Sequence, residues 1–192
     1  MRMAEIEAYV CQSQLIEGIG YTKSKQLTSD HIAAAEYVWR QATVGLWPDV
    51  RVVHRMLATS FLSRAGSFRT VPVYVASAKE GAPRTDMPAP QHVSQLMEYW
   101  EQCGQTIRQD VERDVSSESS CFALYYILLC IHPFEDGNGR VARLMCNAAR
   151  IVCGLPWYTF TADVHPLFVG KLRTFEKETF RPTFAQLYDT TK

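Results

Sequence analysis

Apolar residues recur every three or four positions along most of the chain, a spacing that predicts a mainly helical protein. The pattern predicts helices over 3–16, 28–46, 50–64, 91–114, 121–131 and 140–153. Two further short helices are expected between Leu167 and Tyr188. Polar or glycine-bearing stretches separate these segments and supply the caps and breaks that helices need.

The stretch from Phe68 to Met87 interrupts the helical pattern. Residues 71–75, Val-Pro-Val-Tyr-Val, favour a β-strand, and residues 79–83 favour a turn. Since Pro72 cannot donate to a ladder, the first strand is predicted to lie at an edge. The sequence therefore predicts an all-α fold whose one sheet is a short exposed β-hairpin.

The apolar run from Cys121 to Ile131 is the best candidate for a central core helix. The predicted core positions on this helix, the following loop and the next helix are Leu124, Ile127, Leu128, Phe134, Leu144 and Ile151.

Composition narrows the class of protein. An apolar content of 47% over 192 residues suits one compact domain. Twenty acidic residues balance twenty basic ones, so no overall field favours nucleic acid or anionic lipid. No apolar run reaches the length of a membrane span, and the six scattered cysteines form no disulfide or zinc pattern. We expect a cytoplasmic protein with buried free thiols, no membrane partner and no nucleic-acid partner.

The loop after the core helix carries candidate phosphate-binding chemistry. Gly137 and Gly139 allow backbone N–H groups to curl around an anion at the start of the next helix. Arg140 and Arg143 lie three positions apart on that helix, so both guanidinium groups can approach one anion.

Two further residues of this loop add reaction chemistry. Asp136 offers an oxygen ligand for Mg²⁺, and His132 can accept a proton near neutral pH. Each feature also has an ordinary structural interpretation, as a helix-end histidine, a common turn or a solvated helix face.

The combined segment, His-Pro-Phe-Glu-Asp-Gly-Asn-Gly-Arg-Val-Ala-Arg over residues 132–143, resembles the Fic family signature H-P-F-x-[D/E]-G-N-G-R-x-x-R at every specified position. The order of elements is similar to that of the family over roughly residues 28–190. Residues 61–87 resemble the family's flap, a hairpin that holds the target protein by strand pairing. The resemblance implies that the target-docking residues are Val71, Val73, Tyr74 and Val75.

The resemblance also implies an activity and a role for each loop residue. The activity is transfer of AMP from ATP to a Ser, Thr or Tyr hydroxyl of a target protein, with self-modification as a further outcome and the oligomeric state left open. The implied roles are His132 as general base, Phe134 as loop anchor, Asp136 as Mg²⁺ ligand, Gly137, Asn138 and Gly139 as anion nest, and Arg140 and Arg143 as ligands of the distal phosphates.

The form of the loop bears on the nucleotide. Kinase-like members of the family replace the second glycine by lysine, whereas this chain keeps Gly139. Members that transfer UMP or phosphocholine keep much of the same loop, so these groups remain alternatives to AMP.

A second pattern precedes the loop by more than a hundred residues. Ser13, Glu17 and Gly18 match the family's inhibitory motif [S/T]-x-x-x-E-[G/N]. The resemblance implies that Glu17 pairs with Arg143 in the place of the γ-phosphate, so that residues 1–20 form an inhibitory segment and residues 21–192 the catalytic domain. The alternatives are a plain helix end at Glu17, removal of AMP with Glu17 orienting a water, and a binding module without turnover.

Overall fold

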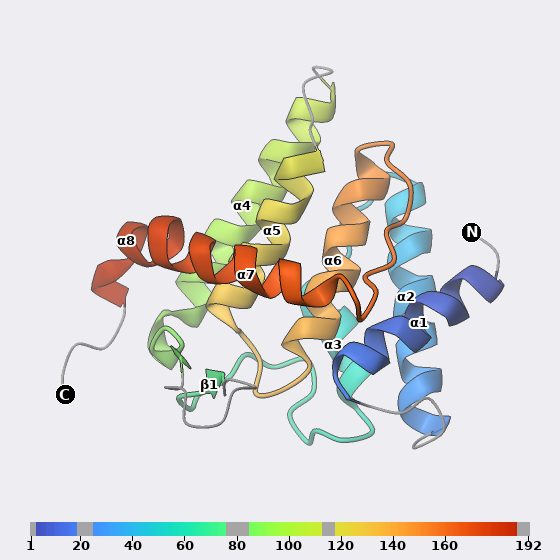
Figure 1. The fold of residues 1–192 in the computed structure, drawn as a ribbon, viewed down its shortest axis with the longest axis horizontal. Helices are drawn as coiled ribbons and strands as arrows, with labels where there is room; N and C mark the ends of the chain where they lie inside the picture. Colours follow the sequence, from blue (N-terminus) through green and yellow to red (C-terminus); the bar gives the residue numbers. More distant parts are fainter. Residues whose placement is uncertain (1–2, 19–24, 76–84, 113–117, 188–192) are drawn as a thin grey trace.

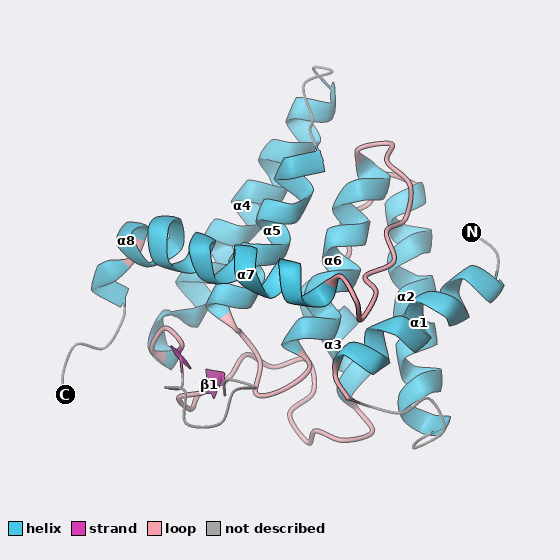
Figure 2. Cartoon of the chain, in the orientation of Figure 1, coloured by secondary structure: helices cyan, strands magenta, loops and turns pink. Residues whose placement is uncertain are grey.

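The computed structural model describes residues 3–18, 25–75, 85–112 and 118–187 (Figure 1). The predicted turn at 79–83 lies outside these residues. Helices make up nearly all of the regular structure in this part of the chain, and the two short strands lie together at one end of the molecule (Figure 2). The predicted all-α fold with one hairpin is confirmed.

Three long helices form the centre of the molecule: α4 (Val93–Glu112), α5 (Glu118–Ile131) and α6 (Asn138–Val152). α5 packs most extensively against α6 and also lies against α4 (Figure 1). Its residues are apolar on nearly every side, as expected for a helix surrounded by protein. The indole N–H of Trp100 in α4 donates to the Leu124 carbonyl in α5 at 3.0 Å, so this buried ring has its hydrogen-bond partner.

Three further helices pack against α6: α1 (Met3–Ile16), α2 (Lys25–Thr43) and α3 (Val50–Ala58). α1 contributes Tyr9 and Val10 to the same buried core as α5 and α6. Its Gln14 side chain is buried and exchanges hydrogen bonds with the Thr28 hydroxyl of α2. α1 is therefore docked on the body of the fold by both apolar and polar contacts.

The boundaries of several helices differ from the predicted ones, most clearly those of α2 and α3. α2 begins at Lys25 instead of being capped near Thr28, because the Thr28 hydroxyl bonds Gln14 across the interface with α1. α3 begins at Val50 as expected, with Asp49 as its N-cap, but ends at Ala58 instead of residue 64. The N–H groups of residues 61 and 62 both bond the Ala58 carbonyl, and this closes the helix early.

The C-terminal part crosses in front of α5 and α6 (Figure 1). It consists of α7 (His165–Phe175), a π-helical turn η2 (Glu176–Phe180), α8 (Arg181–Thr183) and a 3₁₀ turn η3 (Ala185–Leu187). Another 3₁₀ turn, η1 (Pro90–His92), leads into α4. An aromatic cluster joins the α6–α7 segment to α5 through Phe122, Tyr125, Tyr158, Phe160 and Phe168.

The hairpin consists of β1 (Tyr74–Val75) and β2 (Thr85–Asp86), which pair antiparallel with Tyr74 opposite Asp86. The strands are shorter than the β-forming stretch of the sequence. Val71 and Val73 precede β1, although the Val73 carbonyl still accepts from the Met87 N–H at 3.3 Å. Pro72 interrupts the donor pattern there, which explains why regular pairing begins after it.

The predicted core is largely correct. Leu124, Ile127, Leu128, Phe134 and Leu144 are buried. Ile151 is partly exposed and packs against the edge of the core, because it lies in the last turn of α6. None of the helices in the described part of the chain combines the length and the apolar character needed to cross a membrane.

Gly66 lies in the segment after α3, where its backbone closely approaches that helix. Its φ is +81°, and a Cβ there would lie 2.9 Å from the Arg51 carbonyl oxygen. Gly45 has a similar φ of +75° but open space around it. We expect Gly45→Ala to cost about 1 kcal/mol for the left-handed backbone alone. Gly66→Ala should cost roughly 1–3 kcal/mol more, because overpacking adds to the backbone strain.

Urea unfolding of both variants measures this difference. Equal losses in the free energy of unfolding would mean that the backbone near Gly66 yields freely and that its close approach to α3 has no energetic role.

Candidate active site

The loop between α5 and α6 begins at His132, which has a φ of 52°, the one positive φ of a non-glycine residue in the described ranges. Its N–H still bonds the Leu128 carbonyl at 2.9 Å, so it terminates α5 in a left-handed conformation. Its Nδ1 lies 3.3 Å from the Leu129 carbonyl. Since a carbonyl can only accept, Nδ1 carries the ring proton, and the neutral ring keeps Nε2 free to take one.

The protonation of His132 is set mainly by its burial, which lowers its pKa to about 4. The Leu129 carbonyl raises the pKa, the charge of Arg69 lowers it, and Asp136 and Glu17 raise it. The ring is therefore neutral at pH 7 and is available as a base.

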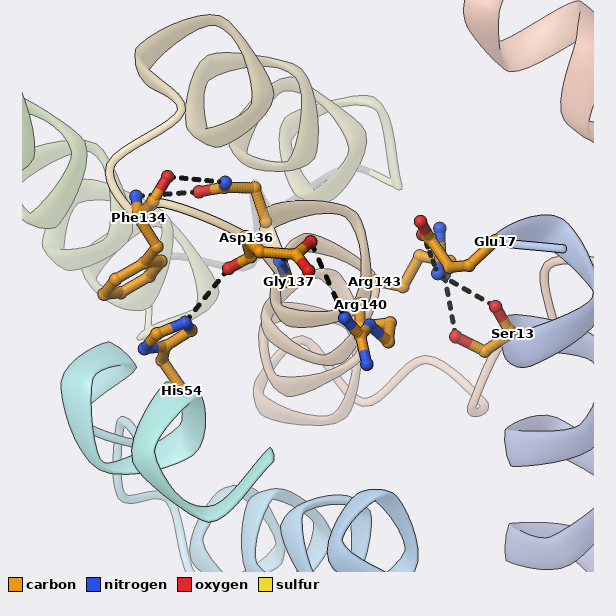
Figure 3. Close-up of polar contacts among 9 residues, drawn as sticks. Ser13, Glu17, His54, Phe134, Asp136, Gly137, Arg140 and Arg143 are labelled. Carbon is orange, nitrogen blue, oxygen red and sulfur yellow. Dashed lines mark hydrogen bonds and ion pairs between the residues drawn. The ribbon is translucent and has the colours of Figure 1, made fainter. Parts of the chain in front are cut away.

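Phe134 and Asn138 hold the loop to α6. The Phe134 N–H donates to Asn138 Oδ1, and Asn138 Nδ2 donates to the Phe134 carbonyl, each at 2.9 Å (Figure 3). Both residues are buried. The Asn138 side chain is thus occupied by the loop backbone, which leaves its own N–H for the predicted anion nest.

His54 of α3 supports this loop from below, and sequence reasoning missed it. Its ring stacks on Phe134 with centroids 3.7 Å apart and an angle of 5°. Nδ1 accepts from the Gly66 N–H at 2.8 Å, so Nε2 carries the proton and donates to the Asp136 carbonyl at 3.0 Å (Figure 3). A lone histidine in an amphipathic helix gives no local signal of this role, because its partners lie in two other segments.

Gly137 precedes α6 in a left-handed conformation with a φ of 79°. The first intrahelical bond runs from the Val141 N–H to the Gly137 carbonyl. The N–H groups of residues 138–140 therefore have no partner within the helix and form the positive end of its dipole. This is a suitable position for an anion.

Asp136 stands at the mouth of this helix end, with 63% of its side chain exposed. Its Oδ1 accepts from the Gly137 N–H and lies 3.7 Å from Nη2 of Arg140. No group of three or more potential ligand side chains for a metal occurs among the described residues. Because Mg²⁺ commonly binds one or two carboxylates together with substrate phosphates, a single exposed carboxylate beside an anion site fits this ion.

Arg140 is a buried cation, and its ion pair with Asp136 is long, at 3.7 Å. Its guanidinium lies over the Phe61 ring at 4.8 Å, and its Nε has no hydrogen-bond partner in the described structure. Burial lowers its pKa, and the neighbouring carboxylates of Glu17 and Asp136 raise it. This buried donor beside a helix N-terminus therefore has hydrogen-bonding capacity that an anionic ligand would use.

Arg143 lies one turn further along α6 and contacts α1. Its Nη2 is 2.7 Å from Glu17 Oε1 and 3.1 Å from the Ser13 carbonyl, and its Nε donates to the Ser13 hydroxyl at 2.9 Å (Figure 3). The side chain of Arg143 is 1% exposed and that of Glu17 is 32% exposed. Burial opposes ionisation of Glu17, but the charge and hydrogen bond of Arg143, with Arg140 and His165, lower its pKa below the ordinary value.

Gly139 leaves space for this approach. A Cβ at that position would lie 2.6 Å from Glu17 Oε1 and 3.3 Å from Nη1 of Arg143. The missing side chain thus leaves the space that the Glu17 carboxylate occupies.

The structure brings together the predicted loop residues and the predicted inhibitory pair. Among the predicted hairpin residues, the side chains of Val71, Tyr74 and Val75 are exposed, and that of Val73 is half-buried.

The contacts of His54 make stability depend on pH. Burial lowers its folded pKa to about 4 from the ordinary 6.5, and the charge of Arg140 lowers it further against the raising effect of Asp136. The unfolded chain therefore binds a proton more readily between these values, and stability falls as pH decreases through this window by up to about 1.4 kcal/mol per pH unit.

His54→Phe keeps a flat ring beside Phe134 but loses both hydrogen bonds. We expect it to be less stable than the wild type by roughly 1–3 kcal/mol at pH 7. The gap should narrow toward pH 4, because the variant lacks the histidine that the wild type must keep neutral. Urea unfolding at several pH values measures it, and a gap independent of pH would contradict the assigned ring contacts.

Comparison with known proteins shows the family. The Fic/DOC family matches residues 48–149, from just before α3 to near the end of α6. The chain is 27% identical over 136 residues to protein adenylyltransferase fic-1 of Caenorhabditis briggsae, covering 66% of this chain and 25% of that protein. It is 32% identical over 109 residues to protein adenylyltransferase Fic of Nematostella vectensis, covering 56% and 23%. The chain thus spans about a quarter of the length of these relatives.

The fold agrees with this match. A Fic domain containing signaling protein from Bacteroides thetaiotaomicron superposes with a TM-score of 0.75 at 17% identity, over 92% of this chain and 74% of the other. The family match spans more than half of the 192 residues and contains the whole loop from His132 to Arg143. The chain belongs to the Fic/DOC family.

Proposed function

We propose that this chain is a protein adenylyltransferase that moves AMP from ATP to a Ser, Thr or Tyr hydroxyl of a target protein and that is inhibited by its own α1. The observation that carries the proposal is the pairing of a neutral histidine with an anion site on one short loop. His132 presents an unprotonated Nε2, and α6 begins a few residues later with free N–H groups and two buried arginines. The adenylyltransferase names of the relatives support the same activity.

ATP is the substrate that this anion site suits. The phosphates would lie against the N–H groups of residues 138–140, with Arg140 and Arg143 beside the distal oxygens. The unsatisfied Nε of Arg140 would gain a partner there. Asp136 would hold Mg²⁺, which would neutralise phosphate charge as the bond to the leaving group breaks.

The chain's residues act on the proton and on orientation. His132 Nε2 accepts the proton of the target hydroxyl as its oxygen attacks the α-phosphorus, and pyrophosphate leaves on the opposite side. The charge of the bound phosphates raises the pKa of His132 in the complex, which makes it a stronger base there than in the free protein. Most of the acceleration comes from positioning and from charge neutralisation.

The hairpin is the proposed docking element for the target. Within the described residues β1 and β2 form a two-stranded sheet, and an extended peptide can add to the edge of such a sheet. The exposed side chains of Val71, Tyr74 and Val75, with the half-buried Val73, would contact the side chains of that peptide.

Inhibition follows from competition for Arg143. Its guanidinium already binds Glu17 and Ser13, so a γ-phosphate would have to displace the carboxylate or take a different position. ATP bound in the second way would not present its α-phosphorus to His132.

A second activity is compatible with the same site. Glu17 remains partly exposed beside Arg143, so its carboxylate can contact a water molecule. Removal of AMP from a modified protein would use that water as the nucleophile. Transfer of UMP or phosphocholine, and a binding role without turnover, are compatible with the loop as well, and labelled ATP separates each of them from AMP transfer.

His132→Ala is expected to abolish transfer while leaving the fold intact. The loop is held by Phe134, Asn138 and His54, none of which needs the imidazole. The loss should be about a hundredfold or more, as for removal of a general base. The rate of AMP incorporation from α-labelled ATP measures it, and unchanged incorporation would mean that another group is the base.

Glu17→Gly is expected to raise AMP incorporation by about tenfold or more, where each tenfold corresponds to about 1.4 kcal/mol of barrier. The change removes the competitor for Arg143 without adding bulk. Glu17→Gly/Arg143→Ala should be silent, because the substrate needs the same guanidinium.

Glu7→Gly is the matched control for this test. Glu7 lies on the exposed side of α1, whereas Glu17 follows its last residue, so the glycine at position 7 weakens the helix at least as much without removing the carboxylate at Arg143. Equal rates for wild type and Glu17→Gly would overturn the inhibitory role. A rise in Glu7→Gly as large as in Glu17→Gly would assign the effect to loosening of α1.

A further inference from the structure

Arg69 is a buried arginine that the proposed chemistry does not use. It lies in the segment between α3 and β1, and it is 2% exposed. Within the described ranges no carboxylate forms an ion pair with it. Burial lowers its pKa to about 10, so its guanidinium remains charged at neutral pH. A buried charge without a counter-ion is costly unless its N–H groups are bonded, so the partners of this guanidinium define its role.

One side of the guanidinium binds the end of α5. Nε donates to the His132 carbonyl at 2.8 Å, and Nη2 lies 3.4 Å from the Ile131 carbonyl. The backbone N–H of Arg69 also donates to the Pro133 carbonyl at 2.9 Å. Carbonyls at a helix C-terminus lack partners within the helix and carry the negative end of its dipole, so a cation there is favourable.

The other side binds the two ends of the hairpin. Nη1 donates to the Val71 carbonyl at 3.2 Å, and Nη2 donates to the Pro88 carbonyl at 2.6 Å. Val71 precedes β1 and Pro88 follows β2. One planar group therefore connects both ends of the hairpin to the backbone of His132, which Figure 1 shows as the meeting of the hairpin with the loop before α6.

The backbone conformation of His132 depends on the same contact. Its left-handed φ is uncommon for a residue with a side chain and persists where surrounding contacts hold it. The Arg69 Nε is the donor to its carbonyl, while Leu129 accepts from its ring. These two bonds set where Nε2 of the imidazole points.

We propose that Arg69 is a positioning residue that ties both ends of the β1–β2 hairpin to the backbone of His132, so that a target peptide on the hairpin and the base on the loop keep one fixed relation. The inference rests on the proposed function for its meaning, but the tie itself is a property of the folded chain. Two segments that must act on the same hydroxyl gain from a common rigid anchor, because small displacements of reacting groups cost large factors in rate.

The charge of Arg69 has a second effect on His132. Burial is the main cause of the low pKa of that ring, and the positive charge of Arg69 acts in the same direction. The groups that oppose it are the Leu129 carbonyl, the Asp136 carboxylate and the Glu17 carboxylate. Removal of the Arg69 charge should therefore raise the pKa of His132.

Two variants separate the hydrogen bonds of Arg69 from the effect of its charge. Arg69→Met removes both, and Arg69→Lys keeps the charge but cannot bond carbonyls on both sides with a planar group. Arg64→Met is the matched control: Arg64 bonds the Thr70 hydroxyl and lies 3.8 Å from the Glu135 carboxylate, but it contacts neither His132 nor the described strands of the hairpin. Amide hydrogen exchange of the folded proteins and NMR titration of the histidine rings are measured on the full chain, with His132→Ala identifying the His132 signal.

Exchange at the amides of residue 69 and Met87, which bond the Pro133 and Val73 carbonyls, should become roughly tenfold faster or more in both Arg69 variants, because bonds to a charged group are lost. Arg64→Met should leave it unchanged. The His132 titration should move to higher pH in Arg69→Met and stay near the wild-type position in Arg69→Lys. Wild-type exchange in a folded Arg69→Met would overturn the tie, and if that variant does not fold, wild-type exchange in Arg69→Lys would do so.

The last measurement, the rate of AMP incorporation, tests whether the hydrogen bonds of Arg69 affect turnover. In the Glu17→Gly background, Arg69→Lys should lower kcat for AMP incorporation by about tenfold to a hundredfold. KM for ATP should not change, because the hydrogen bonds of Arg69 within the described ranges go to the hairpin ends and the end of α5, not to α6. An equal loss in kcat with Arg64→Met would overturn the positioning role. No transfer by Glu17→Gly itself would instead refute the proposed function, while the exchange and titration results would still decide the tie.

Discussion

The buried charge of Arg143 is the constraint on which the arrangement of this protein depends. A guanidinium with 1% exposure must have an anion or several acceptors, because an unpaired charge in the interior costs several kcal/mol. α1 supplies them through Glu17, the Ser13 hydroxyl and the Ser13 carbonyl. The apolar residues of α1 dock the helix, and this polar cluster fixes which of its turns lies over α6.

The same requirement explains why regulation and catalysis would share one side chain. Under the proposed function, Arg143 needs an anion in every state, and either Glu17 or a phosphate of ATP supplies it. Gly139 makes the exchange sterically feasible, because its missing side chain leaves space between α1 and α6 for a carboxylate. The cost of burying Arg143 thus couples the position of α1 to the binding of the nucleotide.

Side chains from inside and outside the loop hold its backbone. Asn138 closes two hydrogen bonds with Phe134 from inside the loop segment. His54 supports the loop from α3, and Arg69 holds the His132 carbonyl from the segment before the hairpin. Three polar side chains from separate parts of the chain therefore hold the backbone between α5 and α6. Each is buried, so the loss of any of these bonds would leave a polar group without a partner.

Local patterns in the sequence are enough to predict the helical class, the hairpin and the position of the candidate loop. The apolar run of α5, the proline in the β-forming stretch and the succession of glycines and arginines after His132 are all visible within short windows. Resemblance to one family motif placed Glu17 beside Arg143 across 126 positions. The roles of His54 and Arg69 emerge only in the folded chain, because their partners are backbone atoms of other segments, and a backbone carbonyl leaves no mark in the sequence. Packing also sets where α2 and α3 begin and end, since a contact such as that of Thr28 with Gln14 overrides a local capping preference.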